Sequence, residues 1–591
     1  MKIKAGKNLS TVNKNLLRTT ISFCIFLFLG IYITYPLIFH MGEYANSEIV
    51  ITWIQNWVVH SIITNPLGLF DTNVYHPFHN TLAYSDTFLP TSILALPLYL
   101  FIREPLVLSN TTFITSLILL GFASYVLSYY ITKNFWISIF SGILIIFSPE
   151  VLDKRIHIQI LAIEGVPLAI FFFLKFLDGS KYKYLVYSLI FFLLQTYNSF
   201  MPGYFILFSY IIIYFFYSRF KNTLAKKAIS KRNILTIVLS FVLLIPIIIP
   251  YLQVSKEFAY VRDIRETIHF AIQPEDLYVP NEYTRLEMPL SILQNLVKYP
   301  ANAEIKSGYI GFIFSILGIV SLFYLYRINK KKNFIFIAFI SIALLGLILS
   351  FGPFLHFDRK TIHHPFPIPL PYLLFYYLAP GFQGFRNSAR FEMLFIISEA
   401  ISIAIMLNQM LNKKIKRLQY FITILLIIAV VVEYQYPMRF HSLPTKEHFP
   451  PVYAWIADNT PKNTVIIELP TYNWDINPFG DNKEVLREYY STMHFRKMVN
   501  GGSGFSPPPW QTLVISLYKS FPSKTSLNTI RKLGVKYMIV HLDEFNIIHR
   551  TNFISHDYLL PDGETVLSEL SINPSINFVK RLDNDYVYEF K

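Results

Sequence analysis

Long apolar runs recur along the chain, and they constrain its fold more than any other feature. Runs of about 18 or more mostly apolar residues have the length that a helix needs to cross a bilayer. Hydrophobic residues make up 53% of the 591 residues and charged residues only 15%. A soluble protein of this length would have difficulty covering so much apolar side chain, because a single core does not grow indefinitely. The sequence therefore predicts an α-helical, polytopic membrane protein.

Eleven membrane spans are predicted from these runs. They lie at residues 18–39, 107–131, 135–149, 159–177, 184–199, 202–218, 234–252, 307–326, 333–351, 390–408 and 418–436. Two further apolar segments, 89–101 and 371–380, are short for a span and contain prolines, which interrupt helices. We expect both to form interfacial or re-entrant helices.

Basic residues are concentrated in a few short segments between the predicted spans. Segments 2–18, 219–232, 327–332 and 413–417 together hold 19 Lys and Arg and no acid. The positive-inside rule places such segments in the cytoplasm, which puts the N-terminus inside and the C-terminal region outside a plasma membrane. The excess of 52 basic over 37 acidic residues is thus a topology signal, and it gives no reason to expect a nucleic-acid partner.

The character of the chain changes near residue 438. Residues 441–591 hold 15 basic and 16 acidic residues, with strand-like runs at 464–470 and 535–542 and a helix-like run at 451–459. This pattern predicts a soluble α/β domain. We therefore expect a transmembrane domain over 1–438, with outer loops at 41–105 and 253–306, and an extracytoplasmic α/β domain over 439–591. The only cysteine, Cys24, lies in the first span and excludes a disulfide within the chain.

The loop after the first span is the first place to look for chemistry. Residues 41–87 contain no Lys or Arg but include Glu43 and Glu48. Trp53 and Trp57 follow at helical spacing, which suits a helix lying at a membrane interface. Glu48 would stand at the start of that helix, where a carboxylate is favoured. It is either a reactive acid or a helix-terminal charge beside an aromatic anchor.

Two other charged groups are expected on the same side of the membrane. The connector between the third and fourth spans carries Glu150, Asp153, Lys154, Arg155 and His157. Arg386 and Arg390 stand at the outer mouth of the tenth span with a spacing that suits one helical face, and they could clamp a phosphate. The alternatives are an ordinary charged helix connector and arginines that snorkel to the membrane interface.

The most distinctive segment of the C-terminal region is NGGSGFSPPPW at 500–510. Its glycines and prolines permit an unusual backbone path, and Phe505 and Trp510 could stack on a sugar ring. A tight structural loop would explain the glycines equally well. No nucleotide-binding, zinc or Ser-His-Asp pattern is present, so nothing supports a nucleotide-sugar donor.

The order of several motifs resembles the membrane glycosyltransferases of the GT-C class. The motifs are an acidic loop after the first span, W-x-x-x-W, NPLGLFDTNVYHP (65–77), FSPEVLDKRIHIQIL (147–161), PGFQGFRNSARFEM (380–393) and YYSTMHFRKMVNGGSGFSPP (489–508). More narrowly, the chain is similar to bacterial and archaeal members that carry a C-terminal outer domain. The resemblance covers nearly the whole chain.

This resemblance implies a polyprenyl-phosphate-linked sugar donor and an extracytoplasmic site. It makes an acid of the first loop the base or a metal ligand, with Glu48 first and Glu43 second. A divalent metal, Mg²⁺ or Mn²⁺, would have Glu48, Glu150 and Asp153 as candidate ligands. One departure matters, because the family usually carries Asp in this loop and this sequence has Asn46-Ser47-Glu48 instead.

The expected function is transfer of a sugar to a glycan, lipid or protein acceptor of the cell envelope. Glu48 and Glu43 would be catalytic, and the donor and acceptor would be bound by Glu150, Asp153, Arg155, His157, Arg386 and Arg390. Two alternatives stay open at this stage. The chain could be a transporter or flippase of lipid-linked saccharide, or a non-catalytic membrane scaffold with the transferase fold.

Overall fold

The computed structural model describes the chain except for residues 1, 47, 223–228, 279–307, 358–359, 363–365, 413, 435–437, 439, 473–480 and 552–559. Most of the predicted outer loop 253–306 therefore lies outside the described residues. The chain divides into two compact units. The helical unit comprises residues 1–39, 111–245 and 261–440, and the mixed unit comprises residues 40–110, 246–260 and 441–591.

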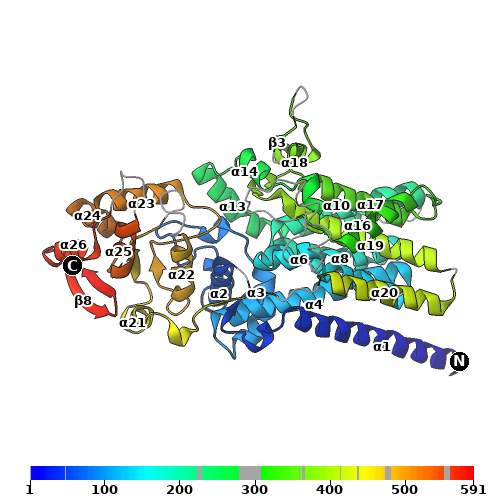
Figure 1. The fold of residues 1–591 in the computed structure, drawn as a ribbon, viewed down its shortest axis with the longest axis horizontal. Coiled ribbons are helices and arrows are strands. Elements are labelled where there is room, and N and C mark those ends of the chain that lie inside the picture. Colours follow the sequence, from blue (N-terminus) through cyan, green and yellow to red (C-terminus); the bar gives the residue numbers. More distant parts are fainter. Residues whose placement is uncertain are drawn as a thin grey trace. The chain divides into compact units, whose positions relative to one another are not determined.

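The helical unit is built mainly from helices (Figure 1). Its helices are α1 (Lys2–Ile33), most of α4 (Pro105–Thr132), α5 (Phe135–Ile146), α6 (Pro149–Asp153), α7 (Ile158–Leu161), α8 (Gly165–Gly179), α9 (Tyr182–Asn198), α10 (Phe200–Phe220), α12 (Lys231–Val242), α14 (Ile264–His269), α16 (Phe312–Tyr324), α17 (Phe334–Ser350), α18 (Pro371–Leu378), α19 (Glu392–Leu411) and α20 (Lys416–Tyr434). Two short strands, β2 (His356–Phe357) and β3 (Lys360–Thr361), pair antiparallel.

Within the described residues, five helical segments are long and apolar enough to cross a membrane. They are Leu16–Ile33, Pro105–Thr132, Ile158–Gly179, Phe200–Phe220 and Ser388–Leu411. Two bent pairs, Phe135–Ile146 with Pro149–Ile156 and Lys231–Val242 with Ile245–Phe258, raise the number to seven if each pair is one span. The chain is therefore a multi-span helical membrane protein.

Helices occupy all the predicted spans, but several are short. Helix α16 has 13 residues and α17 has 17, whereas a straight span needs about 20. Apolar composition reveals the helix but not its length, so the count of eleven stays a prediction. Helices α17 and α19 pack closely because Gly346 has no side chain: a Cβ there would lie 2.7 Å from the backbone nitrogen of Phe395.

The mixed unit joins segments that are far apart in the sequence. Its elements are β1 (Tyr44–Ala45), α2 (Ile49–Thr64), α3 (Leu89–Tyr99), α13 (Ile245–Phe258), β4 (His441–Ser442), α21 (Pro451–Asn459), β5 (Val465–Leu469), α22 (Asp481–Ser491), β6 (Lys497–Met498), α23 (Pro508–Ser520), α24 (Lys524–Lys532), β7 (Tyr537–His541), α25 (Leu542–Thr551), α26 (Gly563–Ser571), β8 (Ile576–Leu582) and β9 (Asp585–Phe590). Strands β1 and β4 pair antiparallel, so the first loop (residues 41–105) is part of the same unit as the C-terminal region.

A five-stranded sheet with the order β6-β5-β7-β9-β8 forms the centre of the C-terminal region. Strands β6, β5 and β7 are parallel, and β9 and β8 continue the sheet antiparallel. The predicted strands 464–470 and 535–542 are confirmed as β5 and β7, and helix 451–459 as α21. The apolar side chains of Val452, Ile456, Ile466, Ile539 and Val587 form the core between α21 and the sheet.

Helix α3 reverses the usual pattern of burial. It buries Thr91 and Ser92, while Ile93, Leu94 and Leu98 are exposed. Helices in water bury apolar side chains, whereas a helix in contact with lipid can expose them. At 11 residues α3 is too short to cross a bilayer, which agrees with the predicted interfacial or re-entrant helix.

Candidate functional site

Glu48 is the residue that precedes helix α2. Its backbone is extended, its side chain is exposed, and it makes no capping hydrogen bond to the helix. The helix behind it is largely buried, with Trp53 2% and Val58 0% exposed. The first turn of a helix attracts negative charge. The structure thus presents an exposed carboxylate at the start of a helix whose body is fixed in the mixed unit.

Glu43 precedes Glu48 in the sequence and lies in the turn that leads into β1. Its carboxylate is 3.1 Å from Nδ1 of His40, and both side chains are exposed. Its carbonyl oxygen accepts a hydrogen bond of 2.8 Å from the amide of Leu443. Exposed ion pairs contribute at most about 1 kcal/mol, so this pair leaves the Glu43 carboxylate accessible to other partners.

Asn46 stands close to where the resembling family carries its acid, and it faces the interior. The residue is 1% exposed, and its Oδ1 accepts a hydrogen bond of 3.4 Å from the Ser109 hydroxyl. An amide has no basic site that could take a proton at neutral pH. Ser47 lies outside the described residues. Within the described part of this loop, Glu43 and Glu48 are therefore the acids nearest to the family position.

In the helical unit, the predicted connector 150–157 is more buried than the sequence suggests. Glu150 is fully buried in α6, where its Oε1 is 2.5 Å from Nζ of Lys154 and its Oε2 accepts a hydrogen bond from the amide of Gly308. Asp153 is one-third exposed and lies 3.3 Å from the same Nζ. Glu150 is thus paired with Lys154 in the interior. Of the two acids, Asp153 is the one that solvent reaches.

The basic side chains of the connector differ in exposure. Arg155 is 8% exposed, with its guanidinium 5.9 Å from the centre of the Phe440 ring, and His157 is half-buried. Arg155 is therefore partly occupied by protein contacts. Of the two, His157 offers more surface to a substrate.

Arg386 and Arg390 do not share a helical face. Arg386 lies outside any helix or strand, Arg390 lies in the 3₁₀ helix Ser388–Phe391, and α19 begins only at Glu392. The prediction of one helical face was wrong because the spacing was read with α-helical geometry on a segment that is not α-helical. The Nε of Arg386 is 3.0 Å from Glu266 Oε1, and its guanidinium lies 4.4 Å from the centre of the Phe270 ring. About half of the Arg386 side chain is still exposed.

Glu392, the first residue of α19, is not among the site residues predicted from the sequence. It is fully buried, and neither of its carboxylate oxygens has a hydrogen-bond partner among the residues that the structure describes. It interacts electrostatically with Lys154, Glu150 and Asp276. An acid in a predicted membrane span is itself an unusual signal, and it could have singled out this position.

The predicted site residues fall into two groups. Glu43 and Glu48 belong to the mixed unit, and the 150–157 connector with Arg386 and Arg390 belongs to the helical unit. The convergence of the two groups on one substrate stays a prediction. Among the residues that the structure describes, no three His, Cys, Asp or Glu side chains gather closely enough to hold a metal ion. A divalent metal, with Glu48, Glu150 and Asp153 as its candidate ligands, stays a prediction.

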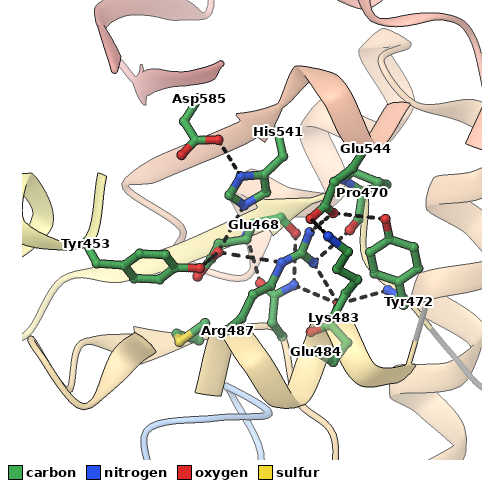
Figure 2. Close-up of polar contacts among 12 residues, drawn as sticks. Tyr453, Glu468, Pro470, Tyr472, Lys483, Glu484, Arg487, His541, Glu544 and Asp585 are labelled. Carbon is green, nitrogen blue, oxygen red and sulfur yellow. Dashed lines mark hydrogen bonds and ion pairs between the residues drawn. The ribbon is translucent and has the colours of Figure 1, made fainter. Parts of the chain in front are cut away.

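A second charged cluster occupies the interior of the mixed unit (Figure 2). Arg487 of α22 is 3% exposed and donates from Nη1 to Pro470 O at 2.8 Å and to Glu484 Oε1 at 2.9 Å. Its Nη2 donates to Glu544 of α25, and its Nε is 3.6 Å from Glu468 Oε2. Arg487 therefore connects α22 to β5 and α25. We call Arg487 with Glu468, Glu484, Glu544 and His541 the buried ionic cluster.

His541 closes the other side of this cluster (Figure 2). Its Nδ1 is 2.7 Å from Asp585, and its Nε2 is 3.0 Å from Glu468. Burial opposes the charged imidazolium, but hydrogen bonds to the two carboxylates outweigh it and raise the pKa of His541 to about 9. Burial raises the pKa of Glu484 to about 7, although Arg487 opposes the shift. The buried ionic cluster thus pairs its charges internally.

The glycine loop at 500–510 has a packing role. A Cβ on Gly501 would lie 2.6 Å from the buried ring of Tyr75, and the amide of Gly502 donates to Glu488 Oε1 at 2.7 Å. Trp510 is 2% exposed and donates from Nε1 to Val499 O. The hypothesis that Trp510 stacks on a sugar was wrong, because its ring is enclosed. Phe505 packs against Tyr260, with ring centres 4.1 Å apart.

Comparison with known proteins shows similarity in structure alone. The sequence matches no protein-family model and no curated protein. Among solved structures, the arabinofuranosyltransferase AftD from mycobacteria is 11% identical with a TM-score of 0.53, over 97% of this chain and 40% of AftD. The chain thus spans less than half the length of AftD.

Two further structures have lower scores. The oligosaccharyltransferase of Archaeoglobus fulgidus is 12% identical with a TM-score of 0.49, over 90% of this chain and 70% of that one. ArnT from Cupriavidus metallidurans, solved with undecaprenyl phosphate, is 9% identical with a TM-score of 0.40, over 98% of both chains. The resemblance drawn from the motifs is confirmed for the fold: over most of its length, the chain is structurally similar to the GT-C membrane glycosyltransferases.

Proposed function

We propose that the protein transfers a sugar from a polyprenyl-phosphate-linked donor to a glycan, lipid or protein acceptor of the cell envelope, with Glu48 as the general base. The observation that carries this proposal is the placement of Glu48: an exposed carboxylate at the start of the buried helix α2, in the loop where the resembling family carries its acid. The fold similarity to AftD, an arabinofuranosyltransferase, supports the reaction class.

The chemistry needs a base and a cationic environment. The acceptor hydroxyl loses its proton to the Glu48 carboxylate as its oxygen bonds to the anomeric carbon. The bond from that carbon to the phosphate oxygen breaks, and the electron pair leaves on the lipid phosphate. The growing negative charge is stabilised by a cation, for which Arg386 is the half-exposed candidate. Burial and the nearby Arg390 hold the pKa of His157 well below its usual value, so this histidine contributes as an uncharged hydrogen-bonding group.

The proposed site lies on the extracytoplasmic side of the plasma membrane. Eleven spans place every dense basic segment in the cytoplasm and place the first loop and residues 441–591 outside. The fold supports a multi-span protein, and the full count of spans belongs to this proposal. Asp153, one-third exposed on the 150–157 connector, would then contribute from the same side.

The experiment is sugar transfer by the purified protein in liposomes that contain a polyprenyl-phosphate sugar and an acceptor glycan. We expect a transferred sugar and free polyprenyl phosphate in equal amounts. Movement of the donor between leaflets without transfer would support the flippase instead, and the absence of both transfer and movement would contradict the proposal. Repeating the assay with EDTA, and then with added Mg²⁺ or Mn²⁺, tests the metal requirement separately.

A further inference from the structure

We propose that Arg487 is a positioning residue for Glu48, acting through helix α22. The inference rests on the proposed function, because it takes Glu48 as the general base. It assigns a role to the buried ionic cluster, which lies outside the first loop. Arg487 and Glu48 belong to the same compact unit, and α22 packs directly against α2. The cluster holds α22 in place, and α22 in turn fixes the end of α2 at which Glu48 stands.

The first step is the attachment of α22 to the sheet. Arg487 is almost fully buried, and its guanidinium reaches Pro470 O and Glu468 at the end of β5 and Glu544 on α25. The planar fork of arginine can serve three directions at once, which a lysine ammonium on a single flexible stem cannot reproduce. Arg487 therefore fixes both the distance and the rotation of α22 against the sheet.

The acids around Arg487 are themselves held. Glu468 Oε2 accepts a hydrogen bond of 2.6 Å from the Tyr453 hydroxyl and contacts His541, while Asn500 bonds to both the amide and the carbonyl of Glu468. The Tyr472 hydroxyl donates to Glu544 Oε2 at 2.9 Å. A network in which each charge has several partners is rigid. The acids that bind Arg487 therefore hold α22 in a fixed position against the sheet.

From α22, one route reaches Glu48 through apolar packing. Tyr489 is fully buried and belongs to one cluster with Ala45, and Ile49, the residue after Glu48, packs against this cluster. The Tyr489 hydroxyl donates to Pro444 O at 2.9 Å, close to β4, which pairs with β1. The residues on both sides of Glu48 are therefore positioned by α22.

A second route runs through hydrogen bonds. Ser491, the last residue of α22, accepts a hydrogen bond of 3.0 Å from Asn73 Nδ2, and Asn73 Oδ1 accepts one of 3.2 Å from Trp53 Nε1. Trp53 lies just over one turn from Glu48 on α2. The two routes meet at the first turns of α2, so a shift of α22 displaces the Glu48 carboxylate. A displacement of 1 Å can cost about 100-fold in rate.

The test is a double-mutant cycle on kcat, using Arg487→Lys, Glu48→Gln and the double variant, with sugar transfer as the readout. We expect Arg487→Lys to lower kcat about 10- to 100-fold with KM changed less than about 3-fold. In the Glu48→Gln background the same change should lower kcat less than about 2-fold, because the group that it positions is gone. Arg531→Lys, on the exposed face of α24, is the matched control.

The outcomes separate this inference from the proposed function. If Glu48→Gln loses activity and the effects of the two single variants multiply in the double variant, Arg487 does not act through Glu48 and the inference fails alone. If Glu48→Gln transfers sugar at the normal rate, the assignment of the base fails, and the positioning role fails with it.

A milder variant covers the case in which Arg487→Lys does not fold. Ser491→Ala removes the acceptor of the Asn73 side chain at the end of the second route, together with the hydrogen bond that the Ser491 hydroxyl donates to Glu488 O within α22. We expect the same pattern with a smaller loss, about 3- to 10-fold in kcat, with an unchanged melting temperature in detergent. Loss of kcat that persists in the Glu48→Gln background would overturn the inference here as well.

Discussion

The side chain of Asn73 donates a hydrogen bond to the hydroxyl of Ser491, although 418 residues separate them. Three backbone hydrogen bonds join the same two segments: Met498 N to Asn73 O at 2.6 Å, His76 N to Met498 O at 2.8 Å and Tyr75 N to Asn500 O at 2.9 Å. Segment 73–76 thus covers the edge of the sheet at β6. We therefore expect the first loop and the C-terminal region to depend on each other for folding.

This relationship predicts the behaviour of the isolated C-terminal region. Expressed alone, residues 441–591 expose the edge of β6 and lose the buried ring of Tyr75, so we expect a partly folded or aggregating product. The same segment joined by a linker to residues 40–110 should be more stable, by a few kcal/mol. Circular dichroism and denaturant unfolding measure both. A cooperative transition at the same midpoint in both proteins would contradict the prediction.

The buried ionic cluster predicts a pH dependence of stability. The pKa of His541 is raised from about 6.5 in the unfolded chain to about 9 in the fold. Its contribution is therefore complete below pH 6.5 and is lost as the pH rises through 9, by at most about 3 kcal/mol. We expect the melting temperature in detergent to fall over this range.

His541→Gln isolates that contribution. The variant should be less stable near pH 6.5, and its melting temperature should change less between pH 6.5 and 9 than that of the unmodified protein. His441→Gln, at an exposed histidine of β4, serves as the control and should keep the original slope. An unchanged slope in His541→Gln would show that the cluster does not hold the imidazolium.

Gly501 supplies a packing test. Gly501→Ala forces a methyl group against the ring of Tyr75, which is 0% exposed and cannot move outward. We expect a loss of about 1–3 kcal/mol in the free energy of unfolding, seen as a lower melting temperature. Gly384→Ala is the control, because a Cβ there would meet nothing within 4 Å. Equal stability of the two variants would argue against close packing of Tyr75.

The topology can be tested with reporter fusions. We expect a fusion after residue 330 to report the cytoplasm and one after residue 450 to report the outside, because the basic segment 327–332 follows the positive-inside rule. Each fusion must retain normal membrane abundance. A cytoplasmic signal at residue 450 would remove the proposed location of the site.

The sequence predicted helices, strands and the acid-bearing loop because each has a local signature. An apolar run identified α17 as a helix and a strand-like run identified β5, but neither could show that α17 has only 17 residues. The partnership of Asn73 with Ser491 has no local signal, since it depends on how distant segments meet. Lys154 was found as one of several charges, yet its burial against Glu150 follows from packing that composition does not encode.

The candidate site shows the same division. Glu48 was identified from its charge and its place before an apolar helix, and the structure confirms that it precedes α2. Arg487 was not identified, because a single arginine in a charge-balanced segment gives no indication that it will be buried among three glutamates. Buried charge pairs of this kind become visible only in three dimensions.

The most direct measurement is kcat for sugar transfer from a polyprenyl-phosphate donor by Glu48→Gln in membranes. We expect a loss of about 10²- to 10⁴-fold, as for removal of a general base, with normal membrane abundance. Asp71→Asn, at another exposed acid of the first loop, should transfer at close to the normal rate. Normal transfer by Glu48→Gln would move the assignment to Glu43, and normal transfer by the Glu43→Gln, Glu48→Gln double variant would contradict the enzymatic role of this loop.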